Sequence, residues 1–280
     1  MASTTENNIS RGLDNNETMT LETYKFPADR LKKKLSNDEK TPIVLVSCGS
    51  FSPPTNLHLR MFEEATDFCE FETNYEVIGG FFSPVGDAYK KAGLASAHHR
   101  INMTRIAVRD SSTWISVDPW EPLHKEYMPT VKVLDHFDHE LNDVMGGIET
   151  STGEKKKIHV ALLAGADLIQ TMSTPGLWAR EDLRRILGVY GAFILERSGT
   201  DIGTCFSHLL RMLILTILRR RARQLAGMEG QHSGHPTTYP ERCFFDQDPL
   251  VPQAREEHSL LHSRSGCRLH LRAWPLCFRR

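Results

Sequence analysis

Residues 42–58 read PIVLVSCGSFSPPTNLH. The apolar run at residues 43–48 has the length and branching of a strand that is buried on both faces. A turn-rich segment at residues 49–54 follows it, and Thr55 is placed to cap a helix. Apolar residues then recur at helical spacing, namely Leu57, Met61, Phe62, Ala65 and Phe68. This strand–loop–helix unit predicts the opening of an α/β fold.

The same pattern repeats along the chain. Further strands are predicted at residues 76–82, 114–117, 159–164 and 192–195. Helices are predicted at residues 98–110, 130–141, 168–172 and 179–187. Strands that alternate with helices imply a mostly parallel sheet covered on both faces. Ligands bind such sheets at the carboxyl ends of the strands, where residues 49–51 and 165–167 fall.

The formal net charge of −1 over 280 residues conceals two compositions. Residues 1–202 carry 22 basic and 29 acidic side chains, whereas residues 203–280 carry 12 arginines, no lysine and 6 acidic side chains. We therefore expect a disordered N-terminal arm (residues 1–40), a domain (residues 41–202) and an atypical, poorly ordered Arg-rich tail (residues 203–280). Within the arm, Leu21–Leu35 is expected to form a short helix, and residues 146–157 of the domain a loop.

The loop Gly49-Ser50-Phe51 and the helix after it form the first candidate site. A glycine after a buried strand lets a ligand approach the backbone. Loop N–H groups and a helix N-terminus together suit a phosphate. His58, about one turn into the helix, would point toward the same anion and stabilise developing charge. A turn followed by a surface histidine explains the pattern equally well.

Three other segments have both a functional and a structural interpretation. Lys90 and Lys91 lie on a glycine-bounded loop that would reach a polyphosphate, although a solvated loop is the simpler explanation. Trp120 follows a strand and would stack on a planar heterocycle, or it would pack in the core. Asp167 would accept hydrogen bonds from ribose hydroxyls, or it would cap a helix.

Several common sites are absent from the sequence. It contains no P-loop, no Gly-x-Gly-x-x-Gly fingerprint and no Gly-x-Ser-x-Gly elbow. No Cys-x-x-Cys pair indicates zinc, and we expect Cys48 and Cys69 to be buried free thiols of a reducing compartment. No apolar run reaches the ~18 residues that a membrane span needs. The polar residues 1–20 show no secretory signal.

Together these motifs resemble the signature of the eukaryotic nicotinamide mononucleotide adenylyltransferases. The segment from Gly49 to Arg60 is similar to that family's Gly-Ser-Phe loop followed by Thr-x-x-His. Four further blocks follow in order, at residues 83–91, 117–121, 165–178 and 190–199. The resemblance runs from about Ile43 to Asp201. It implies a Rossmann-like nucleotidylyltransferase fold that is incomplete at the C-terminus.

The resemblance also implies a reaction and residue roles. AMP would move from ATP to nicotinamide or nicotinate mononucleotide, which gives NAD or deamido-NAD and pyrophosphate. His58 and Lys91 would be catalytic, Mg²⁺ would arrive on the ATP phosphates, and no side chain would ligate a metal. ATP would be held by Gly49, Ser50, Phe51, Thr55, His58, Lys91 and Arg197. The mononucleotide would be held by Tyr127, Thr130, Gly165, Asp167, Leu177 and Trp178.

The sequence departs from the family after Asp201. Family members continue with a Ser-Ser-Thr-Lys-x-Arg helix start that grips the ATP β- and γ-phosphates, whereas no lysine follows Lys157 here. The abrupt change indicates a shifted reading frame or an alternative terminal exon, with a divergent genuine tail as the alternative. We expect impaired activity. The alternative is an inactive truncated isoform that binds nucleotides or a protein partner.

The expected partners are therefore ATP and the mononucleotide, with neither nucleic acid nor a membrane, and homo-oligomerisation stays open. Residues 206–218 with the following arginines fit a membrane-surface helix only weakly. The expected location is the nucleus or the cytoplasm. A nucleotidylyltransferase acting on a phosphopantetheine or a choline-type phosphate is a weaker alternative, which Tyr127, Trp178 and residues 83–91 disfavour.

Overall fold

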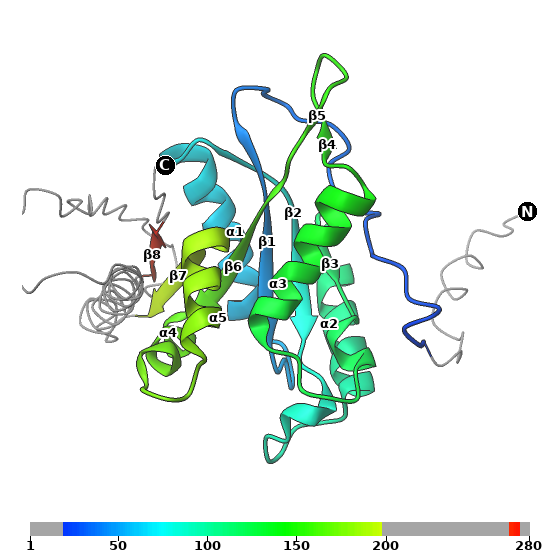
Figure 1. The fold of residues 1–280 in the computed structure, drawn as a ribbon, viewed down its shortest axis with the longest axis vertical. Helices are drawn as coiled ribbons and strands as arrows, with labels where there is room; N and C mark the ends of the chain where they lie inside the picture. The colour runs from blue at the N-terminus through cyan, green and yellow to red at the C-terminus, as the bar shows by residue number, and fades with distance from the viewer. Residues whose placement is uncertain (1–18, 198–268, 275–280) are drawn as a thin grey trace, which may run out of the picture.

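The computed structural model describes residues 19–197 and 269–274. Their strands form a six-stranded sheet in the order β3-β2-β1-β6-β7-β8 and a separate hairpin of β4 and β5 (Figure 1). The strands are β1 (Thr41–Gly49), β2 (Tyr75–Pro84), β3 (Ile115–Val117), β4 (Ile148–Glu149), β5 (Lys155–Lys156), β6 (His159–Gly165), β7 (Ala192–Arg197) and β8 (Leu269–Trp274). The helices are α1 (Asn56–Glu72), α2 (Ala97–Ser111), α3 (Thr130–Asp138), α4 (Ala166–Ser173) and α5 (Arg180–Arg185). Short 3₁₀ or π turns are η1 (Asp87–Tyr89), η2 (Glu121–Leu123), η3 (His139–Val144) and η4 (Ile186–Tyr190).

The first five strands of the main sheet, from β3 to β7, are all parallel. They are the five strands that the sequence predicts, and each predicted helix of the domain overlaps one of α1 to α5. The predicted α/β class, a mostly parallel sheet with helices on both faces, is confirmed. Only β8 runs antiparallel to its neighbour β7.

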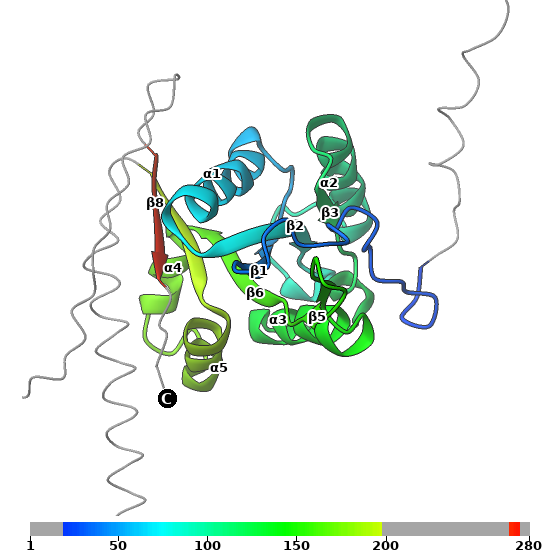
Figure 2. The same ribbon diagram turned by 90° about the horizontal axis from the view of Figure 1, so that it is seen from above.

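The central strand β1 shows why the sheet is covered on both faces. Val44 and Val46 belong to one hydrophobic core, and Ile43 and Leu45 belong to the other. Helices α3, α4 and α5 cover the first face, and α1 and α2 cover the second (Figure 2). Because side chains alternate along a strand and both faces are buried, every position of β1 in this run must be apolar.

The segment before β1 is not helical, so the predicted helix at Leu21–Leu35 is wrong. Its backbone donates to carbonyls that are distant in sequence: the Lys32 N–H to Ile78 O (2.9 Å) and the Leu35 N–H to Glu149 O (2.9 Å). Leu31 and Leu35 are buried in the core. Residues 31–35 of the predicted arm therefore pack beside β2 and β4, where tertiary hydrogen bonds replace helical ones.

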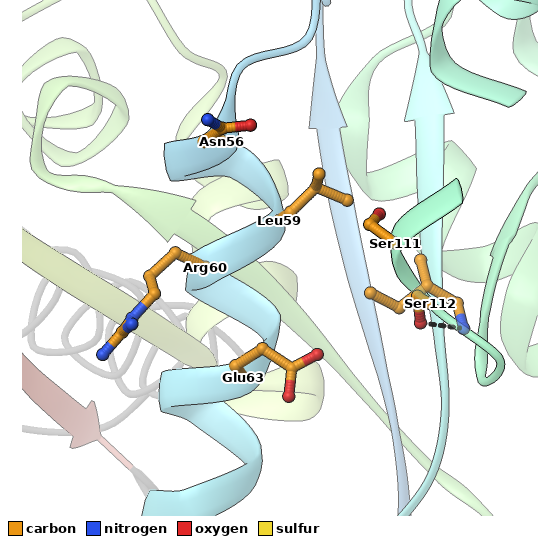
Figure 3. A pocket seen from close by; sticks show the side chains of 7 residues that line it. Asn56, Leu59, Arg60, Glu63, Ser111 and Ser112 are labelled. Atoms are coloured by element: carbon orange, nitrogen blue, oxygen red, sulfur yellow. Dashed lines mark hydrogen bonds between the residues drawn. The ribbon is translucent and has the colours of Figure 1, made fainter. Parts of the chain in front are cut away.

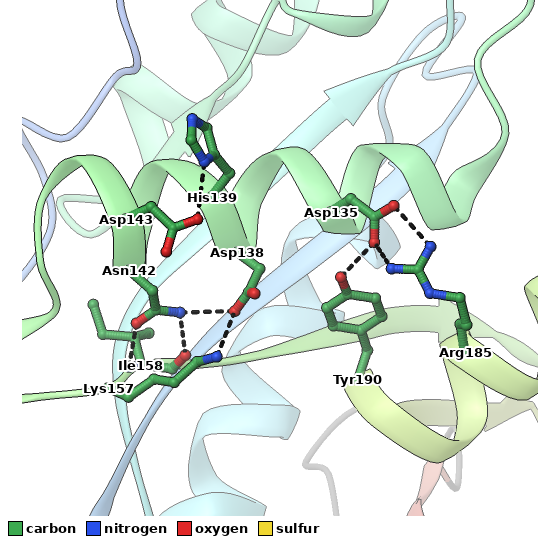
Figure 4. A network of polar contacts seen from close by, with 9 residues as sticks. All are labelled: Asp135, Asp138, His139, Asn142, Asp143, Lys157, Ile158, Arg185 and Tyr190. Atoms are coloured by element: carbon green, nitrogen blue, oxygen red, sulfur yellow. Dashed lines mark hydrogen bonds and ion pairs between the residues drawn. The ribbon is translucent and has the colours of Figure 1, made fainter.

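The end of α3 is anchored to the sheet by one amide side chain (Figure 4). The predicted helix at residues 130–141 is α-helical to Asp138 and continues as the π turn η3. Asn142 donates from Nδ2 to Asp138 Oδ1 (2.8 Å) and to Ile158 O (2.9 Å), and its Oδ1 accepts the Ile158 N–H (2.8 Å). The predicted loop at residues 146–157 contains the short hairpin of β4 and β5.

The tail contributes one described element, β8, where the sequence pattern predicts no strand. Its backbone pairs with β7 from Leu269 opposite Arg197 to Trp274 opposite Ala192. The apolar segment at residues 206–218 and the arginines after it lie outside the described residues. Among the residues that the structure describes, no helix is long and apolar enough to cross a membrane.

Candidate active site

The candidate site lies where the strand order reverses. The chain builds β1, β2 and β3 outward on one side of β1, and then returns to build β6 and β7 on the other side. β1 ends at Gly49 and its parallel neighbour β6 ends at Gly165. The carboxyl ends of such a pair open a crevice in which α/β proteins bind ligands. Both predicted strand-end sites therefore fall at one topological switch point.

The loop after β1 is folded tightly onto its own strand. A Cβ at Gly49 would lie 2.9 Å from Cζ of Phe51, so only glycine fits there. Phe51 has a φ of 45°, which is rare for a residue with a side chain. Its buried ring packs edge-on against Phe82 (4.8 Å between centroids) and His58 (5.3 Å). Phe51 thus supports the loop and His58 from beneath.

His58 is held by the helix start that the sequence predicts. Thr55 is the N-cap of α1, and its backbone N–H donates to Nδ1 of His58 at 2.9 Å. An amide N–H can only donate, so Nδ1 is an acceptor and the neutral imidazole carries its proton on Nε2. The Thr55 hydroxyl lies 2.8 Å from the same Nδ1. This geometry presents Nε2–H as a hydrogen-bond donor.

A buried arginine connects this loop to the lysine loop. Arg100 on α2 is 0% exposed. It donates to Ala95 O (2.8 Å), to Ser50 O (3.1 Å) and to Asp87 Oδ1 (3.2 Å). Asp87 also accepts the Ala97 N–H at the start of α2 (2.7 Å). Arg100 therefore ties the loop after β1 to the loop that carries Lys90 and Lys91.

The lysine loop itself is open to solvent. Lys90 and Lys91 are both exposed, and Lys90 has a left-handed φ of 50°. The loop is joined to the first loop by the Val85 N–H, which donates to Gly49 O at 2.9 Å. Lys91 forms no ion pair with the residues that the structure describes. An exposed cation beside a helix start is suited to neutralise a bound polyphosphate.

Aromatic residues gather beside this loop pair. Tyr127 is 50% exposed and its ring stacks on that of Tyr89, with centroids 5.9 Å apart and 27° between planes. Burial, together with the nearby Glu121, raises the pKa of the Tyr127 phenol. Trp120 and Trp178 are partly buried against the same core as Cys48.

Two cavities lie away from the switch point. One of about 220 Å³ lies between α1 and the end of α2 and is lined by Asn56, Leu59, Arg60, Glu63, Ser111, Ser112 and Ile115 (Figure 3). Another of about 230 Å³ lies at the amino end of β2 beside Lys32, Lys40 and Glu76. None of the predicted site residues lines either cavity.

Comparison with known proteins agrees with this geometry. A family model described as cytidylyltransferase-like matches residues 46–229, which is more than half of the chain. The chain belongs to the cytidylyltransferase-like family. The match extends beyond Asp201, the residue at which the resemblance to the adenylyltransferase sequence motifs ends.

Curated relatives of this cytidylyltransferase-like chain carry one kind of name. Nicotinamide/nicotinic acid mononucleotide adenylyltransferase 2 of Saccharomyces cerevisiae is 54% identical over 183 residues, which cover 65% of this chain and 46% of the yeast protein. Nicotinamide/nicotinic acid mononucleotide adenylyltransferase of Schizosaccharomyces pombe is 49% identical over 194 residues, which cover 69% of this chain and 52% of that protein. Nicotinamide/nicotinic acid mononucleotide adenylyltransferase 1 of Bos taurus is 40% identical over 195 residues, which cover 60% of this chain and 69% of the bovine protein. The chain spans about half the length of the yeast relatives that it matches.

The second strand-end site of this cytidylyltransferase-like domain is compact. Gly165 is the residue before α4, and a Cβ there would lie 2.6 Å from Oδ1 of Asp167. Asp167 lies in the first turn of α4 and is exposed, so it is not the N-cap. Its carboxylate folds back over the strand end. The close approach explains why glycine occupies this position.

The remaining predicted residues are distributed around the same edge. Thr130 is the first residue of α3 and is buried, whereas Leu177 is 62% exposed. Trp178 donates from Nε1 to the Thr171 hydroxyl at 3.2 Å. Arg197 is the last residue of β7, and its side chain lies outside what the structure describes. Their placement at strand ends and helix starts is compatible with one extended site.

The structure adds buried polar residues that the sequence prediction did not select. Glu121 is 3% exposed, and burial raises its pKa to about 8. Its Oε2 lies 3.5 Å from the hydroxyl of the buried Ser83. Arg100 was detectable as an arginine on the buried face of a predicted helix, with Thr104 and Val108 at the same face. Glu121 had no comparable signal, because its partners are distant in sequence.

The two described cysteines are both free thiols, as predicted. Cys69 is buried, and burial raises its pKa to about 12. Cys48 directly precedes Gly49 and is partly buried. Desolvation of its thiol, together with the carboxylates Glu121 and Asp118, raises its pKa well above the usual value. Both thiols are therefore protonated and unreactive near neutral pH.

Proposed function

We propose that this chain is a nicotinamide or nicotinate mononucleotide adenylyltransferase. The observation that carries the proposal is the unit formed by Gly49, Thr55 and His58 at the switch point of the sheet. A glycine loop, a helix N-terminus and a donor Nε2–H form an anion site at a strand end. The names of the curated relatives support the substrates, ATP and the mononucleotide.

In the proposed reaction, a phosphate oxygen of the mononucleotide attacks the α-phosphorus of ATP. A P–O bond forms there, the bond to the β-phosphate bridging oxygen breaks, and pyrophosphate leaves with that electron pair. His58 donates its Nε2–H to an α-phosphate oxygen, where charge develops. Backbone groups of Gly49, Ser50 and Phe51 hold the phosphates, and Thr55 holds His58. No covalent protein intermediate is needed, because positioning and charge stabilisation supply the catalysis.

The other proposed contacts follow the edge of the sheet. Lys91 neutralises the polyphosphate, and Arg197 contributes at the end of β7. Tyr127 and Trp178 stack on the nicotinamide ring, while Thr130 and Leu177 line its pocket. Gly165 contributes backbone groups, and Asp167 binds the dinucleotide.

The proposed reaction uses Mg²⁺ that enters on the ATP phosphates. Within residues 19–197 and 269–274, no group of three or more His, Cys, Asp or Glu side chains is placed to hold a metal ion. The donor set at the switch point, an imidazole N–H with backbone amides and a lysine, suits phosphate oxygens rather than a cation. When bound, the ion would neutralise phosphate charge.

We further propose that activity is impaired, because the Ser-Ser-Thr-Lys-x-Arg element is absent from the sequence after Asp201. Loss of such cationic contacts reduces the stabilisation of the transition state more than it reduces the stability of the fold. The second candidate is a non-catalytic nucleotide-binding or partner-binding isoform, which the same absence favours. We also propose a nuclear or cytoplasmic location without nucleic-acid or membrane partners. Homo-oligomerisation remains compatible with the proposal.

The test is an NAD-formation assay of the full chain with ATP, Mg²⁺ and nicotinamide or nicotinate mononucleotide, together with calorimetric binding of each nucleotide. Slow NAD formation supports the enzyme with impaired activity, and normal turnover contradicts the impairment. Mononucleotide binding without NAD formation supports the non-catalytic isoform. A chain that neither binds a nucleotide nor forms NAD would overturn both the enzyme and the nucleotide-binding isoform.

A further inference from the structure

A stacked pair of rings lies directly after β3. The indole of Trp120 and the imidazole of His136 are parallel within 5°, with centroids 4.1 Å apart. His136, on α3, is 8% exposed, whereas Trp120 keeps partial exposure. The ring of His124 packs on Trp120 at a steeper angle, with centroids 4.3 Å apart. Trp120 is therefore oriented by two histidines while part of it remains available to a ligand.

Trp120 belongs to the edge of the sheet that carries the candidate active site. It packs against the same core as Trp178 and Cys48, and Cys48 directly precedes Gly49. The next residue, Glu121, is close enough to act electrostatically on both Cys48 and Tyr127. Trp120 is thus the sequence neighbour of a carboxyl group that acts on Cys48 and Tyr127, and a planar ring bound beside those two residues would lie near its indole.

The position of His136 is set by a phenol from the segment before β1. The hydroxyl of Tyr24 donates to Oδ1 of Asp118 at 2.9 Å and lies 2.9 Å from Nε2 of His136. Burial and the adjacent Asp118 raise the pKa of the Tyr24 phenol, so it keeps its proton. Because that single proton goes to Asp118, Nε2–H of His136 must donate to Tyr24.

Asp118 is the fixed end of this chain of hydrogen bonds. It is 0% exposed, and its Oδ1 also accepts the backbone N–H of Trp120 at 3.2 Å. Its Oδ2 lies 3.3 Å from Nε2 of His136 and has no hydrogen-bond partner among the described residues. Because one buried oxygen of Asp118 already lacks a hydrogen-bond partner, losing a partner of the other oxygen would be costly.

Charged groups and aromatic rings surround the imidazole of His136 on its other sides. Glu140 on the next turn lies 4.0 Å from Nδ1, and Arg105 on α2 acts electrostatically on Asp118. The rings of Phe26 and Phe137 pack edge-on or tilted against the imidazole, with centroids 6.1 Å and 5.7 Å away. The face toward Trp120 is the one that packs in parallel.

We infer that Tyr24 is a positioning residue for the mononucleotide, because it holds His136 and thereby the indole of Trp120 at the carboxyl edge of the sheet. The inference rests on the proposed function for the identity of the ligand. It assigns a role at the site to the segment that contains Tyr24, which precedes β1 and therefore every strand and helix of the domain. A planar pyridine ring would bind to a Trp120 that this segment keeps in place.

The experiment uses the full chain labelled with 5-fluorotryptophan, whose four indoles are resolved by fluorine NMR, with Trp120→Phe for assignment. Tyr24→Phe removes one hydroxyl. The matched control is Tyr190→Phe, because Tyr190 also donates to a carboxylate, Oδ1 of Asp135 next to His136 (2.6 Å, Figure 4). Binding of nicotinamide mononucleotide and of ATP is measured by calorimetry for the wild-type chain, Tyr24→Phe and Tyr190→Phe.

We expect Tyr24→Phe to shift the Trp120 resonance and to raise the mononucleotide dissociation constant about fivefold, the effect of one net hydrogen bond. The dissociation constant of ATP should stay within about twofold, which a general loss of structure would not allow. Tyr190→Phe should change neither quantity. An unmoved Trp120 resonance, or a shifted resonance with unchanged mononucleotide affinity, overturns the inference. If the wild-type chain binds no mononucleotide, the proposed function fails, and the resonance alone decides whether Tyr24 positions Trp120.

Discussion

β1 and β8 occupy opposite positions in one sheet. β1 lies at its centre, pairs with β2 and β6, and has Ile43, Val44, Leu45 and Val46 fully buried. β8 lies at the edge and pairs only with β7, in the antiparallel direction (Figure 1). A central parallel strand requires apolar side chains on both faces, whereas an antiparallel edge strand requires little beyond backbone pairing.

The two strands also differ in how they relate to the edge of the sheet that carries the candidate site. The loop after β1 is fixed by Phe51 and Arg100, and it leads into the helix that orients His58. β8 begins opposite Arg197 and carries its chain away from the site edge. Changes at the end of β1 should therefore have large effects on stability and chemistry, and removal of β8 should have a small effect.

Arg100→Met should have the largest effect and so tests the central region most directly. It leaves Ser50 O, Ala95 O and Asp87 without their buried donor. The Asp87 side chain is exposed, so the cost comes mainly from the two carbonyl acceptors, and an acceptor left without its donor typically costs about 1–3 kcal/mol of unfolding free energy. The measurement is urea unfolding followed by circular dichroism. Arg109→Met, on an exposed arginine near the end of the same helix, is the control and should cost under ~0.5 kcal/mol. Equal losses for the two variants would contradict the role of Arg100.

His58→Ala tests whether the chemistry lies at the end of β1. If His58 stabilises developing phosphate charge, the turnover for NAD formation should fall by roughly 10²–10³-fold. The unfolding free energy should fall by only about 1 kcal/mol, because the imidazole also accepts the Thr55 N–H at the start of α1. His99→Ala, on an exposed histidine of α2, is the control. Unchanged turnover in His58→Ala would place the chemistry elsewhere.

The contrast between local and distant contacts explains what the sequence could predict. The five parallel strands and the N-cap Thr55 follow from apolar runs and spacing within a few residues. The helix expected at Leu21–Leu35 is wrong because its backbone donates to Ile78 O and Glu149 O, which no local pattern encodes.

The candidate site divides along the same line. Gly49, Thr55 and His58 are close in sequence, and short-range contacts link them: Phe51 packs against Gly49 and His58, and the Thr55 N–H donates to His58. The partners of Tyr24 lie 94 and 112 residues away, so its position could not be inferred. The roles assigned to Lys91, Asp167 and Arg197 stay predictions, because they depend on ligands rather than on contacts within the chain.

Glu121→Gln gives a smaller effect that depends on pH. Burial raises the pKa of Glu121 from 4.5 to about 8, so the folded protein holds a proton that the unfolded chain releases. The stability that this proton contributes is fully present below pH 4.5 and is lost as the pH rises through about 8. Glutamine mimics the protonated form, so the variant should gain about 1–3 kcal/mol over the wild type between pH 5 and pH 8.5.

The measurement for Glu121→Gln is the midpoint of urea unfolding at both pH values. Glu126→Gln, on an exposed glutamate in the loop before α3, is the control and should follow the wild type. A difference between Glu121→Gln and the wild type that stays constant across this pH range would contradict the raised pKa.

Truncation after residue 268 should have the smallest effect. It removes β8 and its six backbone pairs with β7. Each net hydrogen bond contributes about 0.5–1.5 kcal/mol, but ordering each residue costs about 1–2 kcal/mol, so the two nearly cancel for an edge strand. The unfolding free energy should change by under ~1 kcal/mol. In hydrogen exchange, β7 amides that face β8 should lose protection while those of β1 keep it. A loss of ~3 kcal/mol or more would make β8 as integral to the sheet as the central strands, and the contrast between β1 and β8 would then be one of sequence alone.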